Sequence, residues 1–253
     1  MKEVKEYQEF AKHLCRVSAE VIKKYFRTHV SIDQKIDNSP VTIADKKAEE
    51  MMRESILKTF PHHGIIGEEF GTHNSESEFQ WVLDPIDGTK SFICGALSFG
   101  TLVALLKNGE PLFGVFNQPI LNEFLIGDNY STNLNGQKVK VRNCEKISDA
   151  VLLTTDILNI EKYQSAQQFN SLIHKVETFR AWGDCYGYYL LSSGFADIMV
   201  DPIMSFWDIA ALVPIVKGAG GIITDYHGED PLRGQSIIAA SPKIHTQVVR
   251  ELN

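Results

Sequence analysis

The sequence predicts a mixed fold of the α+β or α/β class, and three features of the chain lead to that prediction. Two amphipathic helices are expected at the start, a run of strands follows them, and strands then alternate with helices to the end. The chain has 253 residues, enough to bury a sizeable core without a disulfide or zinc. We divide it into an N-terminal α+β half, 1–140, and a C-terminal α/β half, 141–253, that pack against each other.

The N-terminal half is expected to open with helices and to continue as a strand meander. Apolar residues at steps of three or four predict helices over 1–26 and 44–58, and Pro61 follows the second as a stop signal. Asn108-Gly109 between two apolar runs predicts a hairpin. The expected strands of this half lie at 65–66, 81–83, 101–106, 112–116 and 123–126.

The C-terminal half alternates between the two kinds of element. Its expected strands lie at 151–155, 179–182, 198–200, 222–224 and 237–240. Its expected helices lie at 163–176, 186–193, 209–217 and 245–252. Pro214 inside one of these helices removes a hydrogen bond and should kink it.

Composition and charge exclude several classes of protein. The chain has 25 Lys and Arg against 32 Asp and Glu, a net charge of −7. Without a basic stretch it is a poor nucleic-acid binder, and no apolar run approaches the roughly 18 residues of a membrane helix. The charged start is unlike a signal peptide, and four widely spaced cysteines suggest reduced thiols in the cytoplasm. An acidic protein that handles an anionic substrate needs a positive mediator, and metal ions are one candidate.

Three segments, 67–71, 81–89 and 206–208, place carboxylates at the ends of apolar runs, where each is costly unless paired, hydrogen-bonded or metal-bound. In the second, Pro85 disfavours helix and Gly88 permits a turn, so a strand is expected to end at Asp84 and to aim Asp84 and Asp87 at one point. One such acid is more often a cap than a ligand, but three together favour hard divalent ions.

Four motifs in chain order resemble the magnesium-dependent inositol monophosphatase superfamily over nearly the whole chain. They are Pro40–Asp45, Gly67–Glu69, Asp84–Thr89, and Trp207–Ala211 with Gly218–Gly221. The resemblance implies a layered α-β-α-β-α sandwich, a homodimer, and hydrolysis of a phosphate monoester with two or three Mg²⁺ ions.

The resemblance also implies which residues hold the ions. Glu68, Asp84 and the Ile86 carbonyl would hold one Mg²⁺. Asp84, Asp87 and Asp208 would hold a second, and Glu68 would help position a third. Most of these ligands come from the N-terminal half, and Asp208 comes from the C-terminal half.

Further residues are implied around the reacting phosphate. Thr89 and Asp45 would orient the attacking water, so Asp45, Glu68 and Thr89 are the expected catalytic residues. The amides of Gly88 and Thr89 would bind the phosphate, since a helix that starts there would form an anion site.

Substrate choice depends on residues outside the ion cluster. The string Gly183-Asp184-Cys185-Tyr186 resembles the histidinol-phosphate phosphatase branch, and Asp184 could pair with an amine. Asp184 is equally a candidate helix N-cap. Asp201 and Asp87 are further substrate-facing acids, and Arg180 could meet phosphate or pair with a nearby acid. Trp207, in contrast, resembles the inositol branch.

The sequence thus predicts a cytoplasmic phosphatase acting on a small phosphorylated metabolite, with L-histidinol phosphate of histidine biosynthesis as first choice. Inositol 1-phosphate and adenosine 3',5'-bisphosphate are the alternatives, and a metal-binding regulatory paralogue without turnover is the non-enzymatic one. The Asp-x-x-Asp spacing differs from the Asp-x-Asp of phosphatases that form an aspartyl-phosphate. Cys185 is expected to be a structural thiol, and His62 and His63 are expected to face solvent.

Overall fold

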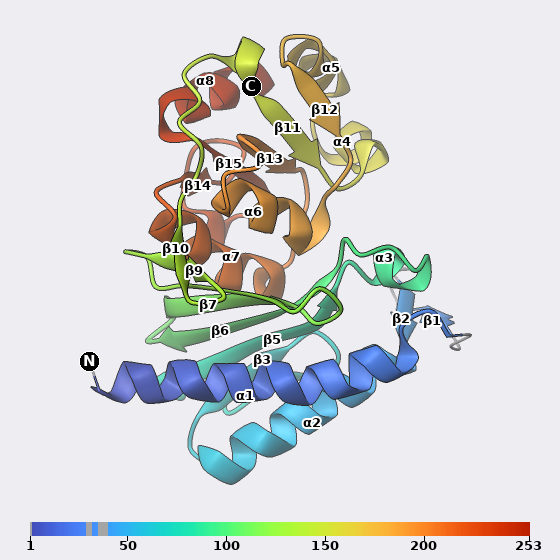
Figure 1. The fold of residues 1–253 in the computed structure, drawn as a ribbon, viewed down its shortest axis with the longest axis vertical. Helices are drawn as coiled ribbons and strands as arrows, with labels where there is room; N and C mark the ends of the chain where they lie inside the picture. Colours follow the sequence, from blue (N-terminus) through green and yellow to red (C-terminus); the bar gives the residue numbers. More distant parts are fainter. Residues whose placement is uncertain (1, 29–31, 35–39) are drawn as a thin grey trace.

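The computed structural model describes residues 2–28, 32–34 and 40–253, and these form five layers in the order α-β-α-β-α (Figure 1). Two helices cover one side of a large sheet, two more lie between that sheet and a smaller one, and three cover the far side. The outer pair is α1 (Lys2–Tyr25) and α2 (Ile43–Thr59), the central pair is α6 (Asp184–Ser192) and α7 (Phe206–Gly218), and the last three are α4 (Ile157–Tyr163), α5 (Ala166–Ile173) and α8 (Pro242–Leu252). The predicted layered sandwich is confirmed.

The larger sheet has eight strands in the order β10-β9-β8-β7-β6-β5-β3-β4. Neighbouring strands are antiparallel except β3 and β5. The strands are β3 (Gly64–Gly67), β4 (Gly71–His73), β5 (Phe79–Asp87), β6 (Gly100–Lys107), β7 (Glu110–Gln118), β8 (Glu123–Gly127), β9 (Thr132–Leu134) and β10 (Gln137–Val139). A separate ribbon pairs β1 (Ile32–Gln34) with β2 (Pro40–Thr42), and a short helix, α3 (Thr89–Ile93), follows β5.

Both faces of the large sheet are buried, which explains its continuous apolar runs. Alternate residues of a strand point to opposite faces. On β5, Trp81 and Leu83 therefore pack with the residues of α1 and α2, whereas Val82 packs with α7. The cluster around Val82 also includes Leu212 and Met199, so both halves of the chain contribute to one central core. The division near residue 140 stays a prediction.

The smaller sheet has five strands in the order β12-β11-β13-β15-β14. Its pairs are parallel between β12, β11 and β13, and antiparallel where β15 joins β13 and β14. The strands are β11 (Val151–Thr154), β12 (Thr178–Arg180), β13 (Ile198–Asp201), β14 (Ile222–Thr224) and β15 (Ile237–Ala240). The expected strand-helix alternation of this half is confirmed.

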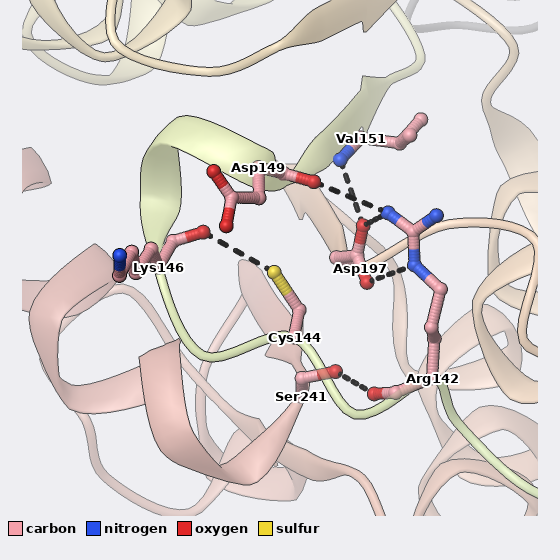
Figure 2. A network of polar contacts seen from close by, with 7 residues as sticks. All are labelled: Arg142, Cys144, Lys146, Asp149, Val151, Asp197 and Ser241. Atoms are coloured by element: carbon pink, nitrogen blue, oxygen red, sulfur yellow. Dashed lines mark hydrogen bonds and ion pairs between the residues drawn. The ribbon is translucent and has the colours of Figure 1, made fainter.

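An ion pair between the exposed Arg142 and the fully buried Asp197 joins the segment after β10 to this sheet (Figure 2). The guanidinium Nε of Arg142 donates to Asp197 Oδ1 over 2.9 Å, and the backbone N–H of Val151 donates to Asp197 Oδ2 over 2.8 Å. The Ser241 hydroxyl donates to the Arg142 carbonyl, and the Ser241 N–H donates to the Asp197 carbonyl over 3.0 Å. The start of β11 is thereby tied to the Asp197 carboxylate, and the start of α8 is tied to the backbone carbonyls of Arg142 and Asp197.

Most predicted elements are present, with small shifts of their ends. Residue 1 of the first predicted helix lies outside the described residues. The predicted helix 163–176 is present as the shorter α5, which begins after Ser165, whose hydroxyl accepts the N–H of Gln168 over 3.3 Å. Helix α4, which ends at Tyr163, was not predicted. Helix α7 continues through Pro214.

Three further expectations are tested by the structure. All four cysteines are free. Among the residues that the structure describes, no helix combines the length and apolar character needed to cross a bilayer. The expectation that His63 faces solvent is wrong, because its ring stacks 4.7 Å from that of Phe60 and its Nδ1 accepts from Trp81 Nε1 over 3.2 Å.

Candidate functional site

A bulge at the end of β5 brings two aspartates to one side of the sheet. Asp84 pairs with Leu102 of β6 and Asp87 pairs with Gly100, so three steps along β5 match two along β6. In a regular strand these aspartates would face opposite sides, and the extra residue reverses one of them. Pro85 has no N–H to donate to the ladder, which favours the irregularity. The predicted strand end at Asp84 is therefore wrong, because β5 continues to Asp87.

Asp208 joins these two acids from the other half of the chain. It is the third residue of α7, where its carboxylate accepts the N–H of Ser205 over 2.9 Å in a capping box. One carboxylate oxygen from each of Asp84, Asp87 and Asp208 lies within 4.8 Å of the others. Asp87 also accepts the backbone N–H of Cys185 at the start of α6. Segments attached to both sheets thus meet at this cluster.

Glu68 lies next to the cluster because β3 runs parallel to β5. Its backbone N–H donates to the Leu83 carbonyl over 3.2 Å, which extends the strand alignment by one residue. The charge of Glu68 contributes to the raised pKa of Asp84, and Glu68 lines the same cavity as Asp87 and Asp208.

The carboxyl groups of this cluster repel one another. Burial, then the charges of Glu68, Asp87 and Asp208, raise the pKa of Asp84 well above its usual range. Burial and the neighbouring acids raise the pKa of Asp87 to about 8 and that of Asp208 to about 7. A divalent cation bound by these oxygens would supply the missing positive charge. The donor set therefore fits a hard metal ion.

Thr89 and Asp45 form a second arrangement beside the acids. The Thr89 hydroxyl lies 3.3 Å from Asp45 Oδ1 and 3.1 Å from the Ile86 carbonyl oxygen. Asp45 is held at the start of α2, where its other oxygen accepts the N–H of Thr42 over 2.8 Å in a capping box. Burial raises the pKa of Asp45.

Gly88 makes the turn between β5 and α3. Its φ is +86°, a conformation that favours glycine. A Cβ there would lie 2.9 Å from Asp184 Oδ2 and 2.9 Å from the Ser98 carbonyl oxygen. The glycine thus permits both the turn into Thr89 and the close approach of Asp184.

The cluster opens into a cavity of about 350 Å³ with further acids on its wall. Asp184 accepts a hydrogen bond from the Ser91 hydroxyl over 3.2 Å, and burial followed by the charge of Asp87 raises its pKa to about 7. Asp184 is the first helical residue of α6 and Gly183 occupies the cap position, so the N-cap alternative for Asp184 is wrong.

Asp201 and Arg180 are placed differently from Asp184. Asp201 lines the cavity, but it is 3% exposed, and its carboxylate accepts the N–H of Thr155 over 3.2 Å and the Tyr188 hydroxyl over 2.9 Å. Arg180 is exposed at the end of β12, with its guanidinium 5.8 Å from the centre of the Trp182 ring, and the cavity wall does not include it. A role for Arg180 in binding substrate stays a prediction.

Lys90, Asp156 and Asn159 are among the cavity residues that the sequence did not predict. Lys90 Nζ lies 3.8 Å from Asp156 Oδ2, and this ion pair spans from α3 to the start of α4, where Asn159 also lines the cavity. Asp156 caps α4, since its Oδ1 accepts the N–H of Leu158 over 2.9 Å. An acid just before an apolar run was the available signal for this helix start.

Cys185 remains a structural residue. Its side chain is fully buried, and burial with the charge of Asp87 raises the pKa of its thiol well above the usual range. A thiol with a raised pKa is a poor nucleophile at neutral pH.

Comparison with known proteins places the chain in a family. The model of the inositol monophosphatase family matches residues 3–253. The chain belongs to the inositol monophosphatase family. It is therefore grouped with phosphoric monoester hydrolases.

Individual family members are similar over most of the chain. A bifunctional phosphatase of Arabidopsis thaliana, the chloroplastic IMPL2, is 46% identical over 85% of this chain, which spans 63% of that protein. A histidinol-phosphatase of Chlorobaculum parvum is 37% identical over 92% of this chain and 91% of its own length. The structure of an inositol monophosphatase from Zymomonas mobilis is 38% identical, with a TM-score of 0.88 over 98% of each chain.

Proposed function

We propose that this family member is a Mg²⁺-dependent phosphatase that hydrolyses the phosphate monoester of a small cationic metabolite, with L-histidinol phosphate as the first choice. The single observation that supports this choice most is the acidic cavity wall. Beyond the ion cluster it is lined by Asp156, Asp184 and Asp201, and among its described lining residues Lys90 is the only lysine or arginine.

Glu68, Asp84, Asp87 and Asp208, with the Ile86 carbonyl, would hold two or three Mg²⁺ ions. When bound, the ions supply positive charge for the phosphate oxygens and lower the pKa of a bound water. The buried, mutually repelling carboxylates support this assignment.

Asp45 and Thr89 would orient the attacking water. The one hydroxyl proton of Thr89 has two acceptors in reach, Asp45 Oδ1 and the Ile86 carbonyl, so the lone pairs of the Thr89 oxygen remain to accept a hydrogen bond from the water. Asp45 is fixed at the start of α2, which limits rotation of the Thr89 hydroxyl. The amides of Gly88 and Thr89 would donate to phosphate oxygens, and the bond from phosphorus to the substrate oxygen breaks on the side opposite to attack.

Asp184 would pair with the ammonium group of the substrate. Its carboxylate is largely buried and accepts a side-chain hydrogen bond from the uncharged Ser91 hydroxyl, so a neutral polyol in the same place would leave it without a cationic partner. This difference favours histidinol phosphate over inositol phosphate. Asp201, whose oxygens accept from Thr155 and Tyr188, would shape the wall beneath Asp184 and add negative potential for the same cation.

Two observations favour an inositol phosphate as the second candidate. The neighbour from Zymomonas mobilis is named an inositol monophosphatase, and Trp207 stands at the position where this sequence resembles the inositol branch. The homodimer and the cytoplasmic location remain proposals that follow from the family resemblance and the free cysteines.

The test is a comparison of kcat/KM for L-histidinol phosphate, inositol 1-phosphate and adenosine 3',5'-bisphosphate, with Mg²⁺ and with EDTA. We expect kcat/KM for histidinol phosphate to be about a hundredfold higher than for either alternative, because only histidinol phosphate brings a positive charge to pair with the buried carboxylate. A hundredfold preference for inositol phosphate would overturn the substrate choice. Absence of turnover with all three would favour the regulatory paralogue.

A further inference from the structure

Glu49 is a fully buried acid on α2 to which the proposed chemistry assigns no role. It lies one helical turn after Asp45, and 0% of its surface is exposed. Its Oε2 accepts the backbone N–H of Glu69 over 2.8 Å, and its Oε1 accepts that of Phe70 over 3.2 Å. Both amides belong to the loop after β3, which carries Glu68.

Arg53 completes this attachment from the next turn of α2. Its Nε donates to Glu49 Oε1 over 2.7 Å, and its Nη2 donates to the carbonyl of Gly71. Its guanidinium also lies 5.9 Å from the centre of the Phe70 ring. Glu49 therefore accepts hydrogen bonds from N–H groups of the loop 69–71, and Arg53 donates one to a carbonyl of the same loop.

The glycine at the start of the loop leaves room for this pair. A Cβ on Gly67 would lie 2.0 Å from Glu49 Oε1 and 2.7 Å from Arg53 Nη2. Real Cβ atoms do not approach that closely, so any larger residue would displace the carboxylate of Glu49 or the loop. Gly67 and Glu49 thus depend on each other.

Glu68 lies between two fixed points as a result. Its own N–H donates to Leu83, next to Asp84, and the next two amides are held by Glu49. The charges of Glu68 and Asp84 repel each other, so the loop must be restrained for Glu68 to remain beside the cluster. Helix α2 supplies that restraint, and it also carries Asp45.

We propose that Glu49, together with Arg53, is a positioning residue that holds the Glu68 loop and thereby sets the affinity of the acidic cluster for Mg²⁺. The inference rests on the proposed function in one respect, that Glu68 takes part in binding metal. Residues behind the ligands commonly set their orientation, and their loss costs roughly 10–100-fold in metal affinity.

The test is a calorimetric titration of the full-length, metal-stripped protein with Mg²⁺. We expect Glu49→Gln to weaken Mg²⁺ binding by about tenfold or more, because the amide retains only one acceptor oxygen for two N–H groups and Arg53. Glu50→Gln, an exposed change on the same helix, is the first control. Asp197→Asn, which changes an equally buried acid that pairs with an arginine away from the cluster, is the second, and both should bind Mg²⁺ as the wild type does.

Two further variants keep the proposal testable if Glu49→Gln does not fold. Gly67→Ala should weaken Mg²⁺ binding in the same direction, because its Cβ displaces Glu49, and Arg53→Lys should weaken it by a smaller factor. In steady-state assays, kcat of these variants should recover at high Mg²⁺ while KM for the phosphate ester stays unchanged.

The outcomes separate this inference from the proposed function. Wild-type Mg²⁺ affinity in folded Glu49→Gln or in Gly67→Ala would overturn the positioning role alone. Equal weakening in Asp197→Asn would also overturn it, since the effect would then be a general loss of stability. Absence of Mg²⁺ binding by the wild type would overturn the metal site itself, and with it the role of Glu49.

Discussion

Two buried acids of this protein, Glu49 and Asp197, have similar hydrogen-bond partners, although Arg53 is largely buried and Arg142 is exposed. Each is 0% exposed, each accepts from an arginine, and each accepts at least one backbone N–H. Asp197 ties the start of β11 to the segment after β10 (Figure 2), and no residue of the acidic cluster is among its partners in the described part of the chain. Glu49 ties down the loop that carries Glu68.

The comparison shows that the local chemistry of an ion pair with a buried acid does not determine the role of that pair in the protein. The two pairs differ in the residue that the restrained backbone carries. Strand β11 bears apolar core residues at this point, whereas the loop after β3 bears Glu68, whose carboxylate lies beside the cluster. We therefore expect changes at the two pairs to affect stability alike and metal binding differently. The predictions below test that division, from the largest effect to the smallest.

The largest effect is expected inside the cluster that Glu49 supports. Asp84→Asn should lower kcat by about a thousandfold or more, because it removes a ligand shared by the proposed ions. It should raise the melting temperature of the metal-free protein, because one of the mutually repelling carboxyls is gone. Phosphate release and thermal unfolding measure both, and full Mg²⁺-dependent activity would contradict the assignment.

The next effect concerns stability at the distant pair. Asp197→Asn should lower the free energy of unfolding by about 2 kcal/mol, because the amide offers one acceptor oxygen where the fully buried carboxylate offers two to Arg142 and to the N–H of Val151. Urea unfolding at saturating Mg²⁺ measures this change. An altered Mg²⁺ affinity in this variant would contradict the expectation that only the Glu49 pair affects metal binding.

The third effect is a pH dependence of thermal stability that arises from the acids of the cluster and of the adjoining cavity wall. The pKa values of Asp184, Asp201 and Asp208 are raised to about 7 and that of Asp87 to about 8. A carboxyl whose pKa is higher in the folded protein stabilises it at low pH, and that contribution is lost as the pH rises. The metal-free protein should therefore lose at least about 5 °C of melting temperature between pH 5 and 8. Excess Mg²⁺ should flatten the dependence, and a metal-free melting temperature that rises over this range would contradict the account.

The smallest effect is one of selectivity. Asp184→Asn should reduce the preference for histidinol phosphate over inositol phosphate by about tenfold, since a neutral amide pairs more weakly with an ammonium group. Asp149→Asn, an exposed change, is the control. The ratio of the two kcat/KM values measures the effect, and an unchanged ratio would remove Asp184 from substrate recognition.

The acids of the candidate site were predicted from the motifs that resemble the family, and the structure shows that these acids occupy regular local positions. Asp45 and Asp208 are each the third residue of a helix, three residues after Thr42 and Ser205, a spacing typical of helix starts. Asp84 and Asp87 flank a proline that breaks the strand ladder. Such signals lie within a few residues of the group they place.

What could not be predicted depends on contacts between distant segments. The β5 bulge is defined by its register with β6, and the three-residue strands are too short to show a period. In the sequence, Glu49 resembles any other acid on a helix. Its partners are the N–H groups of Glu69 and Phe70, which lie beyond the next strand, so the nearby sequence gives no sign of these contacts. Asp201 lines the cavity, and its partners Thr155 and Tyr188 come from other elements, so its hydrogen bonds could not be predicted from the neighbouring sequence.

The most direct test of the central claim is phosphate release from L-histidinol phosphate by the metal-stripped wild-type protein as Mg²⁺ is added. The account predicts no release without the ion, saturable activation as the carboxylate cluster fills, and loss of that activation in Asp84→Asn. Release that is independent of Mg²⁺, or an activation curve that Asp84→Asn leaves unchanged, would contradict it.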